Sequence, residues 1–88
     1  MERKKEKIEE LLKMILELDN MEDCKALFDD LCTMKELEKM AERMYAAKLL
    51  IEGKTYNQVM EDADISSATL SRVSRCVQYG SGYSKLLK

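Results

Sequence analysis

Arginines without acidic neighbours lie near the end of the sequence, and their chemistry is that of binding a polyanion. From Ile65 to Lys88 the chain has four cations, among them Arg72 and Arg75, and no acidic residue. A solvated helix face in a chain of net charge -2 would normally mix both signs. Guanidinium groups can reach phosphates and base edges, and this local bias favours a polyanionic partner.

Catalytic and metal-binding chemistry, by contrast, has no support in the residue types. The sequence has no His, its cysteines form no C-x-x-C pair, and it carries no nucleophile or phosphate-loop motif. Any general base would be a carboxylate or a lysine, and these have the pattern of solvated helix faces. We therefore expect no enzyme, no metal and no cofactor, and we expect Cys24, Cys32 and Cys76 to be buried or half-buried reduced thiols.

The basic segment belongs to a stretch, residues 55–79, whose apolar spacing is typical of a helix-turn-helix. The pattern is set by Val59, Ala63, Ile65, Leu70 and Val73. This spacing gives each of two short helices an inward face and puts an apolar residue in the turn. Thr55 and Ser66 can cap the two helices, and Asp64 can adopt the left-handed backbone that such turns need. A generic helical hairpin without a role in DNA binding has the same spacing.

The second helix of this pair would expose a small, polar and basic face. With Leu70, Val73 and Val77 directed inward, the helical period directs outward Ala68, Ser71, Arg72, Arg75, Gln78 and Tyr79. Small residues at the leading end, such as Ser67 and Ala68, would allow close approach to the floor of a groove.

Further helices precede this unit and make the predicted fold all-α. We expect helices over residues 2–18 and 21–31, and a third that starts at a capping box of Thr33 and Glu36 and ends at Gly53. The third helix is apolar nearly all round, although a lone chain of this length buries only about 60–65% of its unfolded surface. We infer an intertwined homodimer whose first three helices interleave across a two-fold axis. A compact monomeric bundle is the alternative.

Charge divides this single predicted domain, residues 1–88, into parts. Residues 1–53, the predicted dimerisation helices, carry ten basic and fourteen acidic side chains, whereas residues 54–88 carry five and three. The basic half contains the helix-turn-helix and a C-terminal tail, residues 80–88, that either begins another helix or stays mobile. No export signal or membrane-spanning run is present, so we expect a cytoplasmic protein.

Two segments, ELEKMAERMYAAKLLIEGKTYNQV and ISSATLSRVSRCVQYG, resemble the Trp repressor superfamily, and within it the YerC/YecD-type Trp-repressor-like proteins. The similarity covers roughly residues 31–83, and the pattern SSATLSRV at residues 66–73 is fairly specific. It implies an all-helical, intertwined homodimer that presents two helix-turn-helix units to DNA. The DNA-binding residues that we assign on this basis and from the helix face are Thr55, Tyr56 and Asn57 near the phosphates, and Ser66, Ser67, Ala68, Thr69, Ser71, Arg72 and Arg75 near the groove.

The resemblance extends to a possible ligand pocket. In Trp repressors two arginines flank tryptophan, and they match Arg43 and Arg72, while Thr33 matches an edge of that pocket. Val73 stands where a Gly gives the indole room, and Cys76 replaces a Ser that helps to hold the amino group. Val73 is also an inward residue of the hairpin, so we expect its side chain to fill the indole's space and tryptophan not to bind.

The sequence therefore predicts a cytoplasmic, dimeric, sequence-specific DNA-binding protein that regulates transcription. Repression is implied by the resemblance alone. The competing class is a helical protein-interaction module whose basic face binds an acidic protein partner. The sequence identifies neither an operator nor an effector.

Overall fold

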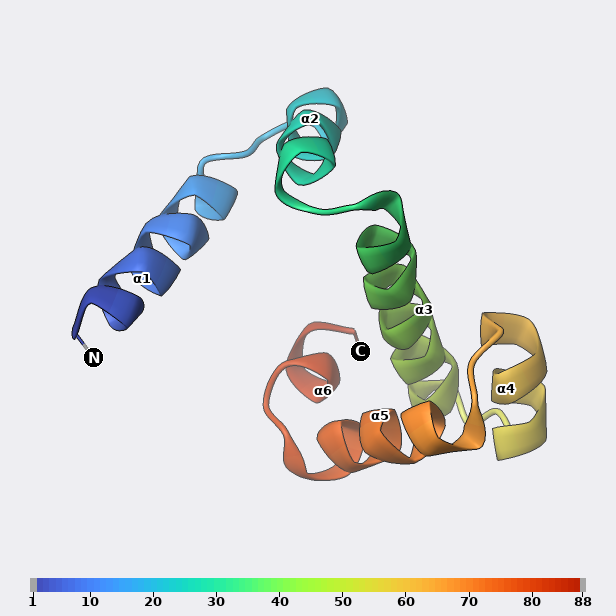
Figure 1. Cartoon of the computed structure of the whole chain (residues 1–88). Coiled ribbons are helices and arrows are strands. Elements are labelled where there is room, and N and C mark those ends of the chain that lie inside the picture. Colours follow the sequence, from blue (N-terminus) through green and yellow to red (C-terminus); the bar gives the residue numbers. More distant parts are fainter. Residues whose placement is uncertain (1, 88) are drawn as a thin grey trace. The chain divides into compact units, whose positions relative to one another are not determined.

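The computed structural model describes residues 2–87, and over this range the chain is helical without a strand, which confirms the predicted all-α fold. The helices are α1 (Glu2–Leu16), α2 (Met21–Leu31), α3 (Met34–Ile51), α4 (Tyr56–Ala63), α5 (Ser67–Tyr79) and α6 (Tyr83–Leu86) (Figure 1). None of the described helices is long and apolar enough to cross a membrane.

The chain divides into two compact units at the start of α3. The first unit ends at Met34 and contains α1 and α2, and the second begins at Lys35 and contains the rest of α3 with α4, α5 and α6. Within one chain, α3 therefore belongs with the predicted helix-turn-helix. Any role of α3 in a dimer would come in addition to this packing.

Local signals explain the two helices of the first unit. α1 ends at Leu16, before the predicted end, because the N–H of Leu18 bonds to the carbonyl of Ile15 at 3.1 Å in a tighter turn. α2 spans the predicted residues. Asn20 caps it, since the side-chain oxygen of Asn20 accepts a hydrogen bond from the N–H of Asp23 at 2.7 Å.

α3 begins directly after Thr33 and ends in a glycine turn, as the sequence predicts. Ile51 is the last helical residue, and Gly53 has a φ of +93°, in the left-handed region that favours glycine. The N–H of Lys54 bonds to the carbonyl of Leu49 at 3.1 Å, which satisfies a carbonyl left open at the helix end. The chain thereby turns from α3 toward α4.

The hydrophobic core of the second unit lies where α3 meets α4 and α5 (Figure 1). Its buried members are Ala46, Ala47 and Leu49 of α3, Val59 and Ala63 of α4, and Leu70 and Val73 of α5. Val59 and Leu70 are fully buried, and burying a side chain of this size stabilises a fold by roughly 1.5–3 kcal/mol.

The helix-turn-helix has the boundaries and caps that the sequence predicts. Thr55 and Gln58 form a capping box at the start of α4, and Ser66 Oγ accepts a hydrogen bond from the N–H of Thr69 at 3.2 Å to cap α5. Asp64 adopts the left-handed conformation, with φ 56° and ψ 50°. Ile65 packs against the core from the turn, so the expected apolar contact is formed.

The segment after α5 forms one further helical turn, α6. Of the two expectations for the C-terminal tail, the structure has the further helix. Tyr83 and Leu87 pack against the core. The backbone of Gly80 passes close to the end of α5, and only glycine allows this. A Cβ at position 80 would lie 2.5 Å from the carbonyl oxygen of Cys76. Any other residue at position 80 would therefore push the segment away from the end of α5.

The three cysteines are free, as expected, but the prediction that all three are buried or half-buried is wrong for Cys76. Cys24 and Cys32 are half-buried as predicted, whereas Cys76 is exposed. The reason is its position on α5, where Cys76 lies beside the inward stripe of Val73 and Val77 but not on it.

Candidate nucleic-acid interface

The two faces of α5 are arranged as the helical period predicts. Leu70 and Val73 are buried and Val77 is partly buried, while the residues predicted to point outward are all exposed: Ala68, Ser71, Arg72, Arg75, Gln78 and Tyr79. Ser66 and Ser67 at the leading end are also exposed, and Thr69 is half-buried. The described face is thus accessible to a partner along the whole length of the helix.

The arginines of this face keep their hydrogen-bonding capacity. No carboxylate within residues 2–87 pairs with Arg72 or Arg75, whereas Lys25 and Asp29 of α2 form an ion pair at 3.0 Å. A guanidinium carries five N–H donors in a planar fork that suits the oxygens of a phosphate. Both groups can therefore bind an external anion without first leaving a partner in the chain.

The starts of α4 and α5 offer further donors. The first N–H groups of a helix have no partner within it, and at α4 the capping box engages those of Thr55 and Gln58. The N–H groups of Tyr56 and Asn57, in the first turn of α4, are left for an outside acceptor. At α5 the side chain of Ser66 accepts a hydrogen bond from the N–H of Thr69, and the N–H groups of Ser67 and Ala68 are left. The helix dipole makes both ends attractive to an anion.

The structure adds one polar residue that the sequence analysis missed. Ser74 of α5 is buried, with 6% of its surface exposed, and its hydroxyl accepts hydrogen bonds from the Tyr56 hydroxyl and from Gln78 Nε2, the latter at 3.3 Å. The helical period contains the signal, because Ser74 follows Leu70 by one turn and therefore lies on the inward face. The Tyr56 side chain, assigned to the phosphates by resemblance, is in this way tied to α5.

Within the second unit, the residues of the possible ligand pocket line two hollows. Arg43 of α3 and Arg72 of α5 line a common hollow of about 450 Å³ together with Ala68 and Thr69. Cys76 instead lines a neighbouring hollow of about 470 Å³ that includes Arg72, Arg75 and Tyr79. Val73 is 2% exposed and belongs to the hydrophobic core, as its inward position predicts. Thr33 belongs to the first compact unit.

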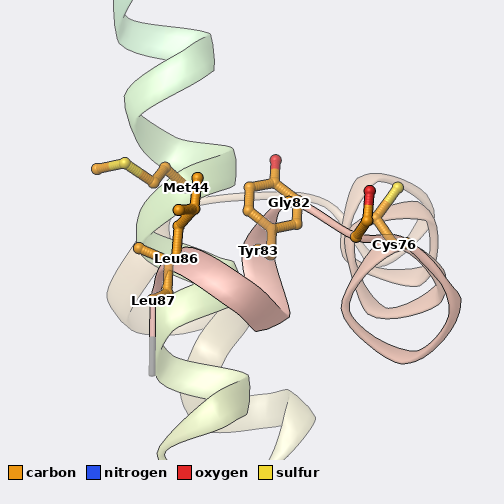
Figure 2. A pocket seen from close by; sticks show the side chains of 8 residues that line it. Met44, Cys76, Gly82, Tyr83, Leu86 and Leu87 are labelled. Atoms are coloured by element: carbon orange, nitrogen blue, oxygen red, sulfur yellow. The ribbon is translucent and has the colours of Figure 1, made fainter.

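A third hollow, of about 520 Å³, is mainly apolar and lies beside α6. Figure 2 shows Tyr83, Leu86 and Leu87 of the C-terminal segment lining it together with Met44 of α3 and Cys76 of α5. Among residues 2–87, no charged side chain contributes to its lining. This hollow is therefore unsuited to an anion and is chemically distinct from the hollow between the arginines.

Comparison with known proteins agrees with this geometry. The family described as Trp repressor protein matches residues 6–88. The chain belongs to the Trp repressor family. A relative is the uncharacterised protein YerC of Bacillus subtilis (strain 168), with 42% identity over 73 residues, which cover 83% of this chain and 70% of YerC. The resemblance to the YerC-type branch is thereby confirmed.

Solved structures of Trp-repressor-like proteins share the fold. A candidate Trp repressor from Staphylococcus aureus is 40% identical and superposes with a TM-score of 0.87, over 91% of this chain and 81% of that one. A TrpR-like protein from Eubacterium eligens ATCC 27750 is 35% identical with a TM-score of 0.88, over 92% and 84% of the two chains. Trp repressor family proteins are helical DNA-binding regulators and not enzymes, which agrees with the expected absence of catalysis.

Proposed function

We propose that this protein is a transcriptional regulator that binds duplex DNA sequence-specifically as a homodimer and represses transcription by occluding its operator. The observation that carries the proposal is the exposed face of α5, where Arg72 and Arg75 have no acidic partner within residues 2–87. Unpaired guanidinium groups on such a face gain affinity by neutralising phosphates. Repression in preference to activation rests on family membership. We also propose a cytoplasmic location.

In this proposal the leading end of α5 enters the major groove. Ser67, Ala68 and Ser71 are exposed and small, so the helix can approach the base edges without a clash. The hydroxyl groups of the two serines can exchange hydrogen bonds with base edges, directly or through water. Ser66 and Thr69 flank them, and Arg72 and Arg75, further along the helix, contact phosphates or base edges.

The first turn of α4 contacts the DNA backbone. The N–H groups of Tyr56 and Asn57 have no intrahelical partner and point out of the end of the helix. A phosphate at this position would accept hydrogen bonds from them and would interact favourably with the helix dipole. Thr55 holds the end in a helical geometry through the capping box, so the donors are fixed before DNA arrives.

A second copy of the chain is proposed because the helices outside the helix-turn-helix expose much apolar surface. On α1 the exposed fractions are 58% for Ile8, 53% for Leu12 and 83% for Leu16. On α3 and α6, Met44 and Leu86 are 52% and 76% exposed. Large apolar side chains exposed to this extent are typical of an interaction site, and interleaved helices of two protomers would cover them in an interface of roughly 2,000 Å² or more.

Selection of bound duplexes from a random pool tests this function and its symmetry together. A homodimer with two helix-turn-helix units should select a palindrome whose half-sites lie about one helical turn apart. A parallel measurement should compare binding to duplex DNA at moderate salt with binding to an acidic protein.

The alternative function, an interaction module for an acidic protein partner, makes the opposite prediction. In that case the pool would yield no enriched sequence, and the acidic protein would displace DNA at moderate salt. Enrichment of a sequence without two-fold symmetry would support DNA binding but contradict the proposed dimer.

A further inference from the structure

A hydrogen bond joins the beginning of α4 to the middle of α5. Tyr56 is the first residue of α4, and its hydroxyl donates to the hydroxyl oxygen of Ser74, a residue 18 positions later in the chain. Gln78 donates to the same oxygen from the next turn of α5, at 3.3 Å. Ser74 is the buried polar residue of the described chain, while Tyr56 is 50% exposed.

The bond lies at the end of α4 that the turn does not hold. The turn fixes the C-terminal end of α4 through the left-handed conformation of Asp64. Between the two ends, α4 contacts α5 through apolar residues such as Val59 and Leu70, and apolar contacts have little directional preference. A hydrogen bond weakens steeply when its angle changes, so the bond between Tyr56 and Ser74 restricts where the first turn of α4 can lie.

The same first turn carries the N–H groups that the capping box leaves for an outside acceptor. The exposed face of α5 begins at the other end of the hairpin. A duplex offers its phosphates and its groove at a fixed separation, so a protein that uses both must hold the two surfaces at that separation. The bond between Tyr56 and Ser74 is the polar link between these two surfaces in the described structure.

We propose that Tyr56 and Ser74 are positioning residues for DNA binding. Their hydrogen bond holds the first turn of α4 against α5, so that the backbone N–H groups of α4 meet a phosphate while the outer face of α5 lies in the groove. The inference rests on the proposed function. It gives the Tyr56 hydroxyl an intramolecular role, so that Tyr56 contributes its backbone N–H, and not its side chain, to the contact with the phosphate.

A double-mutant cycle on the full chain tests this role. Tyr56→Phe and Ser74→Ala should each weaken binding to the selected duplex about two- to tenfold, the range expected from the loss of one hydrogen bond. Since both changes remove the same bond, the affinity of the double variant should be no lower than that of the single variant with the lower affinity. Tyr45→Phe, at a similarly exposed tyrosine of α3, and Ser84→Ala are the matched controls and should leave the affinity unchanged.

Amide hydrogen exchange separates positioning from mere stability and does not depend on DNA. The N–H of Val59 bonds to the carbonyl of Thr55 at 2.9 Å in the first turn of α4, and its exchange should accelerate in Tyr56→Phe but not in the controls. DNA affinities should be measured at a temperature where circular dichroism shows every variant fully folded. If Ser74→Ala does not fold, Tyr56→Phe with this exchange measurement decides the question.

Several results would overturn the proposal. If the loss of DNA-binding free energy in the double variant equalled the sum of the losses in the two single variants, the Tyr56 hydroxyl would contact DNA independently of Ser74. Unchanged affinity in Tyr56→Phe, or unchanged exchange at Val59, would mean that the bond does not position α4. Failure of the unmodified chain to bind any duplex would instead refute the proposed function, and the inference with it; the wild-type measurement alone distinguishes this case.

Discussion

Replacing Arg75 with alanine should weaken binding to every duplex sequence and should make the binding less sensitive to salt. Arg75 is exposed on the outer face of α5, and within the described chain no carboxylate competes with a phosphate for its guanidinium. The substitution therefore removes a phosphate contact without freeing an acidic partner or opening a cavity in the core. Replacing Ser71, at the leading end, should instead change the preference at particular base pairs.

The expected size of the effect follows from the removal of one arginine–phosphate interaction in each protomer. Each such interaction contributes about 0.9 to the slope of log K against log salt, and a dimer presents Arg75 twice, so the slope should flatten by about 1.8. Over a range from about 50 to 200 mM salt, a difference of this size changes the ratio of the wild-type and variant affinities by roughly tenfold. The defect of Arg75→Ala should thus be largest at low salt.

Equilibrium binding over a salt series, with the selected duplex and a random duplex of equal length, measures both quantities. Arg3→Ala is the matched control, because Arg3 is an exposed arginine on α1 and its loss changes the net charge by the same amount. An unchanged slope in Arg75→Ala, or equal flattening in Arg3→Ala, would refute the placement of Arg75 against the backbone. If Ser71→Ala weakened binding equally to specific and random DNA, the groove assignment of α5 would be wrong.

Other predictions concern assembly, the turn and the effector. The chain should sediment as a dimer at micromolar concentration, since its exposed apolar residues need cover, and a stable, fully helical species of 10.2 kDa would contradict the intertwined arrangement. Asp64→Ala should lower the free energy of unfolding by about 1 kcal/mol, because alanine tolerates the left-handed conformation poorly, whereas Asp64→Gly should not; denaturant titration of both variants checks this. Calorimetric titration with L-tryptophan should show no stoichiometric binding, because the side chain of Val73, buried in the core, is expected to fill the space that an indole would need; a micromolar isotherm would show that a tryptophan pocket exists.

The parts of the fold that the sequence predicted are those that depend on nearby residues. A cap needs a hydroxyl or amide side chain three positions before its partner N–H, and Thr55 and Ser66 both satisfy this condition. The inward faces of α4 and α5 follow from helical spacing. Asp64 could be placed in the left-handed region because the spacing of Val59 and Leu70 leaves a turn there.

The residues that the sequence analysis missed or misjudged depend on contacts between distant segments. Tyr56 and Ser74 are far apart in the chain, and only the packed hairpin brings their hydroxyl groups together. Cys76 is a different case, because its exposure follows from its position on α5 beside the inward stripe, which the helical period already indicates. The helix α6 is a single turn and has no side-chain cap, so its formation depends on the packing of Tyr83 against the core.

The separation of buried and exposed positions on α5 has a consequence for how such a regulator can evolve. Leu70, Val73 and Ser74 hold the helix in the fold, while Ser71, Arg72 and Arg75 make no side-chain hydrogen bond or ion pair within the described chain. Substitutions at these exposed positions cost little folding stability. Under the proposed function, a new operator preference can therefore arise through changes in the outer residues while the buried scaffold stays intact.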